Sequence, residues 1–170
     1  NIDLTVRNVI TSRGCPFSCT FCQTVTLREL YKGKGNYIRI RKIDKVLDEL
    51  QLLKNTTATR SFYILDDIFG LDFEWLKDFL TLYKQRVGLE FSCLVRADVV
   101  RKHKDYAKLL KDSGCRMVAF GIESGSERIR NELLRKRISN EDILVAASRL
   151  HDVGIKFRAY NITALPGETL

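Results

Sequence analysis

The sequence predicts an α/β fold in which parallel strands alternate with helices and form an incomplete barrel. Segments with strand character alternate five times with segments of helical periodicity, and this alternation requires parallel pairing through right-handed crossovers. Polar side chains collect directly after each strand, as they do on the carboxyl-terminal rim of a barrel that carries its active site there. Cysteines, and not the Gly-rich fingerprint of a doubly wound nucleotide-binding sheet, follow the first strand, so a barrel is favoured.

The five expected strands are short apolar segments, and the first is rich in Leu, Val and Ile. They cover residues 4–10, 61–65, 91–95, 117–120 and 155–162. The expected helices follow from apolar residues spaced three and four apart, in segments 44–54, 75–83, 106–110, 126–134 and 140–150. Ser126 and Asn140 are the expected N-terminal caps of the last two helices, and Gly114 and Gly154 are expected helix ends.

Length and composition indicate one domain over residues 1–170. A chain of 170 residues can bury a sizeable core, and 45% hydrophobic with 29% charged residues is ordinary for a globular protein. No apolar run approaches the roughly 20 residues that span a bilayer, and no signal peptide is visible. The first residue, Asn1, and the abrupt end after a turn indicate a piece of a longer protein.

The net charge of +8 favours anionic partners in general. Much of the excess lies in one basic cluster, which consists of Arg28, Lys32, Lys34, Arg39, Arg41, Lys42 and Lys45. A phosphate-binding face is one interpretation of this cluster. A solvated charged surface is favoured, because no interleaved aromatic pattern for base stacking accompanies it. Nucleic acid is therefore an open but not a favoured partner.

Three of the five cysteines lie within eight residues, in the segment Gly14-Cys15-Pro16-Phe17-Ser18-Cys19-Thr20-Phe21-Cys22. Soft thiolate ligands select iron–sulfur clusters or zinc. Four ligands would close either kind of site, whereas three leave one metal position open for chemistry. The odd number of cysteines argues against a disulfide framework, and their clustering indicates metal or redox work in a reducing cytoplasm.

Two other interpretations of the cysteines are open from the residues alone. Structural zinc requires a distant fourth ligand, from among Cys93, Cys115, His103 and His151. The first two of these are placed like small core residues. A redox pair like that of thioredoxin would use Cys19 and Cys22 alone, and Cys15 four positions earlier argues against it.

The spacing Cys15-x3-Cys19-x2-Cys22, with Phe21 directly before the last cysteine, resembles that of the radical S-adenosylmethionine enzymes. The wider segment Thr11-Ser12-Arg13-Gly14-Cys15-Pro16 is similar to the subgroup that often carries a cobalamin-binding domain upstream. That subgroup includes the magnesium-protoporphyrin monomethyl ester cyclase of anaerobes. The resemblance extends over the whole chain, and a complete core of this family has six strand–helix units in a TIM-type barrel. About five of the six are present here.

The resemblance implies two cofactors at the cysteine loop. Cys15, Cys19 and Cys22 would bind three irons of a 4Fe–4S cluster, and the amino and carboxylate groups of S-adenosylmethionine would chelate the fourth. One electron, from a reductant such as flavodoxin or ferredoxin, would cleave the sulfonium bond to give methionine and a 5′-deoxyadenosyl radical. The protein would orient the cofactors and exclude side reactions. Cobalamin would be bound by a domain outside this chain.

The resemblance also implies which residues surround S-adenosylmethionine. Phe21 is expected near the adenine. Asp66 or Asp67 is expected to face the methionine ammonium, and alignment with a Gly-Gly-Glu pattern favours Asp67. Arg96 is expected to pair with the methionine carboxylate. The expected ribose and adenine contacts lie later in the chain: Glu123 on the ribose, Ser124 assisting it, and Gly167 in a turn near the adenine.

That turn lies in the tail Asn161-Ile162-Thr163-Ala164-Leu165-Pro166-Gly167-Glu168-Thr169, which resembles the family's Gly-Leu-Pro-Gly-Glu-Thr turn. Ala164 stands where glycine is usual, and Gly167 is expected to supply the turn conformation.

We therefore expect an enzyme core that cleaves S-adenosylmethionine to modify a small-molecule or tetrapyrrole-like substrate by radical chemistry. The alternative is a radical enzyme that modifies RNA, similar to a methylthiotransferase, which the net charge of +8 favours. A third hypothesis is a non-catalytic binding module stabilised by zinc.

Overall fold

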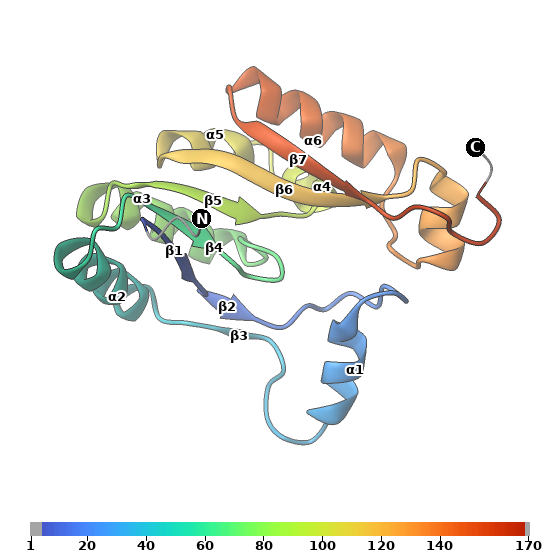
Figure 1. The fold of residues 1–170 in the computed structure, drawn as a ribbon, viewed down its shortest axis with the longest axis horizontal. Coiled ribbons are helices and arrows are strands. Elements are labelled where there is room, and N and C mark those ends of the chain that lie inside the picture. Colours follow the sequence, from blue (N-terminus) through green and yellow to red (C-terminus); the bar gives the residue numbers. More distant parts are fainter. Residues whose placement is uncertain (1–4, 169–170) are drawn as a thin grey trace.

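The computed structural model describes residues 5–168 and contains a five-stranded parallel sheet with the strand order β1-β4-β5-β6-β7. The order follows the sequence, so each crossover adds the next strand to the same side, as in a barrel that has not closed. The strands are β1 (Val6–Val9), β4 (Ser61–Ile64), β5 (Glu90–Leu94), β6 (Cys115–Glu123) and β7 (Lys156–Asn161). The predicted α/β fold is confirmed (Figure 1). Leu4, in the first expected strand, lies outside the described residues.

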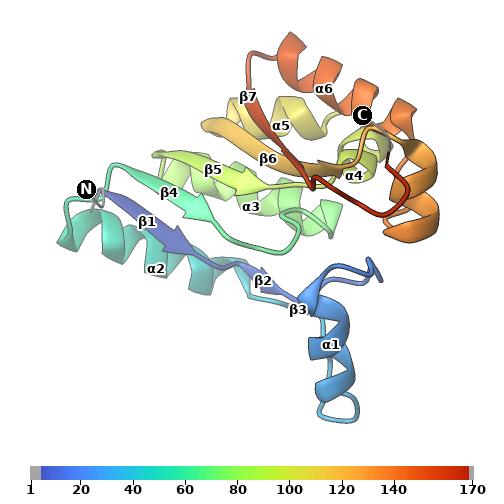
Figure 2. The same ribbon diagram turned by 45° about the vertical axis from the view of Figure 1, so that its right-hand side comes forward.

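Helices cover one face of this sheet, and one helix stands apart from it. The elements are α1 (Gln23–Leu30), α2 (Ile43–Thr56), α3 (Phe73–Arg86), α4 (Ala97–Lys102), α5 (Tyr106–Asp112), a π-helical segment (Ile129–Leu133) and α6 (Asn140–Asp152). Figures 1 and 2 both show α1 projecting away from the sheet beyond the short strands β2 (Ser12–Arg13) and β3 (Arg39–Ile40). No helix among the described residues is both long and apolar enough to cross a membrane.

The two faces of the sheet differ in burial, and β4 shows the pattern. Phe62 and Ile64 are each 1% exposed and pack into the main hydrophobic core with the helices. Ser61 and Tyr63 point to the opposite face and are only half-buried. The sheet therefore has a helix-covered face, which stabilises the fold, and an open face on the inside of the incomplete barrel.

Several short elements were not predicted. Helix α4 has six residues, and the strands β2 and β3 have two each. Helix α1 buries only Thr24, so it has no apolar stripe to reveal it. The prediction that Asn140 caps the last helix was wrong by one residue. The hydroxyl of Ser139 accepts from the Asp142 amide at 3.0 Å, and the Asp142 carboxylate accepts in return from the Ser139 amide, which completes a capping box.

Candidate functional site

The cysteine loop lies between β2 and α1, beyond the carboxyl end of β1. Asp66, 1% exposed at the end of β4, fixes the start of the loop. Its carboxylate accepts from the amide of Thr11 at 2.6 Å, from the hydroxyl of Thr11, and from the hydroxyl of Ser12 at 2.7 Å. Both oxygens of Asp66 are therefore used to join the first two units of the barrel.

Asp67 points to the cysteines instead. Its Oδ2 accepts from the amide of Gly14 at 3.0 Å, directly before Cys15. Gly14 has a φ of +93°, and a Cβ there would lie 2.5 Å from the carbonyl oxygen of Tyr37. The cysteine loop can follow this path only because residue 14 has no side chain.

Hydrogen bonds of two residues, Thr20 and Arg28, fix the far side of the loop. The amide of Thr20 donates to the carbonyl of Leu134 at 3.0 Å, and its hydroxyl donates to the carbonyl of Leu133 at 2.9 Å. Arg28 of α1 donates to the carbonyl of Pro16 and to the hydroxyl of Ser18. Arg28 thus has a structural task, which supports the view that the basic cluster is not dedicated to phosphate.

All three cysteines of the loop line one cavity of about 200 Å³ above the open face of the sheet. The lining brings together seven of the residues expected at the site: Cys15, Cys19, Phe21, Cys22, Asp67, Arg96 and Glu123. Three other expected residues, Asp66, Ser124 and Gly167, do not line it. The cavity also contains Lys136 and Tyr160, which sequence reasoning did not select.

The donor set fits an iron–sulfur cluster. All five cysteines are free thiols, and burial raises the pKa of the Cys15 thiol above its usual range. Within residues 5–168 no three Cys, His, Asp or Glu side chains are gathered closely enough to hold a single metal ion. A structural zinc ion needs all its thiolates about 2.3 Å from one point, whereas a cluster takes each cysteine on a different iron. Cys93 and Cys115 are buried in the core and do not line the cavity of the loop cysteines, so neither is placed to be a fourth zinc ligand there.

Arg96, two residues after β5 and at the N-cap of α4, is a buried cation beside the cysteines. Its Nε forms an ion pair with Asp98 at 2.8 Å, and its Nη2 donates to the carbonyl of Lys136. Its Nη1 lies 3.9 Å from the Sγ of Cys19, and the guanidinium stacks 3.6 Å above the ring of Phe17. The charge of Arg96 lowers the pKa of the Cys15 thiol, although burial raises that pKa by more.

Glu123, at the end of β6, forms an ion pair with Lys136. The Nζ of Lys136 lies 2.7 Å from the Oε1 of Glu123, and both side chains are about one tenth exposed. Glu123 has a φ of +69°, and its carboxylate lies over Gly121, where a Cβ would come within 1.7 Å of Oε1. The same ammonium lies 5.6 Å from the ring centre of Phe21, which is 44% exposed. Gly121 therefore makes the room in which this ion pair sits.

Ser124 and the carboxyl-terminal turn form a hollow next to Glu123, separate from the cysteine cavity. The hydroxyl of Ser124 donates to Glu168 at 2.7 Å, and both residues line this hollow together with Glu123. Ala164 and Gly167 adopt φ of +61° and +76°. The expected turn is present, and Ala164 adopts the left-handed conformation that glycine takes at low cost.

Sequence reasoning missed two cations of the site. Lys136 pairs with Glu123 from thirteen positions away, across the π-helical segment. Arg130 is fully buried and donates to the carbonyls of Ser124 and Ile138 and to the side chain of Asn140. In the sequence Lys136 lies between Arg135 and Arg137, which are both exposed, so its residue type and neighbours gave no signal that it alone is buried.

The sequence profile of the Radical SAM superfamily matches residues 9–170. An uncharacterized methyltransferase of Pyrococcus horikoshii is 34% identical over 95% of this chain and 33% of its own length. A putative methylthiotransferase of Methanocaldococcus jannaschii is 29% identical over 94% of this chain and 35% of its own. The anaerobic magnesium-protoporphyrin IX monomethyl ester cyclase of Rubrivivax gelatinosus is 26% identical over 93% of this chain and 27% of its own length.

Among solved structures, the radical S-adenosylmethionine methyltransferase TsrM from Kitasatospora setae, with cobalamin and a 4Fe–4S cluster bound, superposes with a TM-score of 0.79. The match covers 96% of this chain and 32% of TsrM at 20% identity, so it concerns the fold alone. The chain thus spans about a third of the length of the relatives it matches. Cysteine spacing, sheet topology and profile agree, and the chain belongs to the Radical SAM superfamily.

Proposed function

We propose that this chain is the part of a radical S-adenosylmethionine enzyme that holds the 4Fe–4S cluster and S-adenosylmethionine. The observation that carries the proposal is the cavity itself. Three free thiols, two cations and two carboxylates line one space, although they come from the cysteine loop, three strand ends and the segment after the π-helical turn. When bound, the cluster and S-adenosylmethionine would supply reductive cleavage of the sulfonium bond to a 5′-deoxyadenosyl radical.

The residues of the chain bind and orient these groups. Cys15, Cys19 and Cys22 hold the cluster, and the Asp67 carboxylate faces the methionine ammonium. Asp66 is left out of this set, because its two oxygens are already engaged with the start of the cysteine loop. The Nη1 of Arg96, which is turned toward Cys19, pairs with the methionine carboxylate.

The remaining contacts come from the carboxyl end of β6 and the loop beyond it. Glu123 accepts from the ribose hydroxyls, with Ser124 beside it, and the ion pair with Lys136 holds the Glu123 carboxylate in place. Phe21 and the turn at Gly167 flank the adenine. The exposed face of Phe21 is free to stack on a base, which supports this assignment.

We infer a small-molecule substrate and a cobalamin-associated reaction of the methyltransferase type. The names of the Pyrococcus and Kitasatospora relatives support the reaction type, and cobalamin would be held by parts of the protein outside this chain. A one-electron reductant such as flavodoxin or ferredoxin would supply the electron, and the free thiols are compatible with a reducing cytoplasm.

Modification of RNA is the second candidate. The net charge of +8 and the likeness to a putative methylthiotransferase favour it. The engagement of Arg28 and Arg41 in contacts within the chain favours the small-molecule assignment. Tight binding of transfer RNA to the complete protein, weakening steeply with salt, would favour the RNA candidate.

The test is anaerobic reconstitution of the complete protein with iron and sulfide, reduction in the presence of S-adenosylmethionine, and detection of 5′-deoxyadenosine. We expect this product from the wild type and from a Cys93→Ser control, whose thiol lies in the core. Absence of the product, with the cluster shown to be intact, would contradict the proposal.

A further inference from the structure

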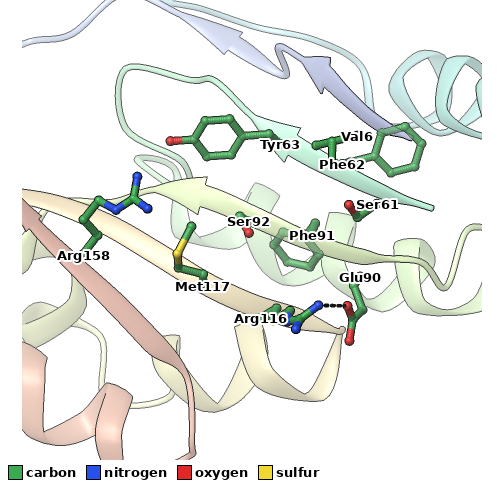
Figure 3. A pocket seen from close by; sticks show the side chains of 10 residues that line it. All are labelled: Val6, Ser61, Phe62, Tyr63, Glu90, Phe91, Ser92, Arg116, Met117 and Arg158. Carbon is green, nitrogen blue, oxygen red and sulfur yellow. Dashed lines mark hydrogen bonds and ion pairs between the residues drawn. The ribbon is translucent and has the colours of Figure 1, made fainter. Parts of the chain in front are cut away.

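A second cavity, of about 320 Å³, lies on the open face of the sheet (Figure 3). Residues of all five strands line it: Val6, Ser61, Phe62, Tyr63, Glu90, Phe91, Ser92, Arg116, Met117 and Arg158. None of the residues assigned above to the cluster or to S-adenosylmethionine is among them. This cavity is therefore distinct from the one that the cysteines line.

The register of the sheet shows where this cavity lies relative to the cysteines. Leu94, Ala119 and Tyr160 line the cysteine cavity. Two residues earlier on the same three strands, Ser92, Met117 and Arg158 line the second cavity. Residues two apart on a strand point to the same face and are about 7 Å apart along it. The second cavity is thus the next layer of the same barrel interior, about 7 Å further from the cysteines.

The charge of the second cavity is unbalanced. Glu90 is paired with Arg116 at 3.1 Å, at one end of the cavity. Arg158 of β7 lines it as well, and among residues 5–168 its guanidinium forms no ion pair and no hydrogen bond. One uncompensated cation therefore faces a concave space next to the cavity in which the chemistry is proposed to take place.

The phenol of Tyr63 lies near Arg158 in this cavity, and the phenol of Tyr160, on β7, lies near that of Tyr63. Figure 3 shows the hydroxyl of Tyr63 and the guanidinium of Arg158 directed toward the same end of the cavity. Burial, more than the neighbouring Tyr160, raises the pKa of Tyr63, so the phenol keeps its proton and can donate a hydrogen bond. A cation and a hydroxyl donor thus lie at one end of the cavity, and the side chains of Met117 and Phe91 line it further along. This arrangement suits a ligand that has an anionic group at one end and an apolar body.

We propose that this layer binds the anionic end, a carboxylate or a phosphate, of the substrate, with Arg158 as its ion-pair partner and Tyr63 as a hydrogen-bond donor. The substrate atom to be modified then lies nearer the cysteines, one layer above. The inference rests on the proposed function, because it takes the cysteine cavity as the reacting end. The substrate class that this site selects is a small organic anion.

The test measures anion binding to the complete, reconstituted protein by ligand-observed saturation-transfer NMR, under anaerobic conditions. The probes are benzoate, phenyl phosphate and the uncharged benzamide, and the variants are Arg158→Gln, Arg158→Lys and Lys156→Gln. Lys156 is the matched control, because it lies on the same strand and face, carries the same charge and does not line the cavity. S-adenosylmethionine binding is measured in parallel for each variant.

We expect the wild type to bind at least one of the two anions and to bind benzamide far more weakly. Arg158→Gln is expected to weaken anion binding on the order of tenfold or more, since a charged hydrogen bond is lost. Arg158→Lys should retain part of the affinity, and Lys156→Gln should leave it unchanged. Preference for benzoate or phenyl phosphate then identifies the anion as carboxylate or phosphate.

Three results would overturn the inference: no anion binding by the wild type, an equal loss in Lys156→Gln, or a loss of S-adenosylmethionine affinity in Arg158→Gln with anion binding unchanged. The last result would assign Arg158 to the methionine carboxylate. None of these measurements depends on cleavage of S-adenosylmethionine, so failure of the proposed function would be recognised separately, by missing cluster or missing 5′-deoxyadenosine.

Discussion

Replacing Lys136 by Met removes one partner of the buried ion pair beside the cysteines. The Nζ of Lys136 lies 2.7 Å from Glu123, and both side chains are about one tenth exposed. The variant leaves the Glu123 carboxylate without its cation, at a residue whose φ of +69° already carries a conformational cost. Breaking a buried pair in this way costs about 3–5 kcal/mol, and we expect the lower value because the pair borders a cavity that water can enter.

Native-state hydrogen exchange of the complete protein, read at the amides of β6, measures this cost locally. A loss of about 3 kcal/mol corresponds to roughly a hundredfold faster exchange through local opening. The double variant Glu123→Gln with Lys136→Met removes both charges and should recover to within about 1.5 kcal/mol of the wild type. If Lys136→Met costs less than about 1 kcal/mol, or if the double variant is no better than the single one, the pair does not stabilise this end of β6.

Three glycine and alanine positions give further predictions. Gly14→Ala should lower the iron bound per chain, because a Cβ would lie 2.5 Å from the carbonyl oxygen of Tyr37. Gly33→Ala is the control and should keep its iron, because Gly33 also has a positive φ but a Cβ there would have no atom within 4 Å. Gly121→Ala should displace the Glu123 carboxylate and weaken S-adenosylmethionine binding on the order of tenfold, without loss of iron, in equilibrium dialysis. An unchanged affinity would refute the proposed role of Glu123. Ala164→Gly should stabilise the carboxyl-terminal turn by about 0.5–1 kcal/mol, because a φ of +61° is strained for alanine. The expected result is slower amide hydrogen exchange in this turn, and faster exchange would contradict the prediction.

The sheet and the longer helices could be predicted because burial leaves a periodic trace in the sequence. Phe62 and Ile64 alternate with half-buried residues in β4, and Leu47, Leu50 and Val46 recur at helical spacing in α2. No such trace exists for α1 or α4. The first buries one residue, and the second is shorter than two turns.

The site was predictable to the extent that it is local in sequence. The spacing of Cys15, Cys19 and Cys22 identifies the loop by itself. Composition and periodicity did not distinguish Asp66 from Asp67, and only the alignment with a Gly-Gly-Glu pattern favoured Asp67. The structure shows one holding the start of the cysteine loop and the other beside Gly14. Lys136 was missed because its pairing with Glu123 depends on the left-handed backbone of Glu123 and on the space over Gly121.

Iron and sulfide content after anaerobic reconstitution of the complete protein tests the central claim most directly. We compare the wild type with Cys19→Ser in the loop and Cys93→Ser in the core, because both residues are buried cysteines and only the first lines the cavity. Cys93→Ser should match the wild type, and Cys19→Ser should bind about four irons fewer per chain, which is one complete 4Fe–4S cluster. Equal iron content in Cys19→Ser and the wild type would contradict the assignment of the loop as the cluster ligand.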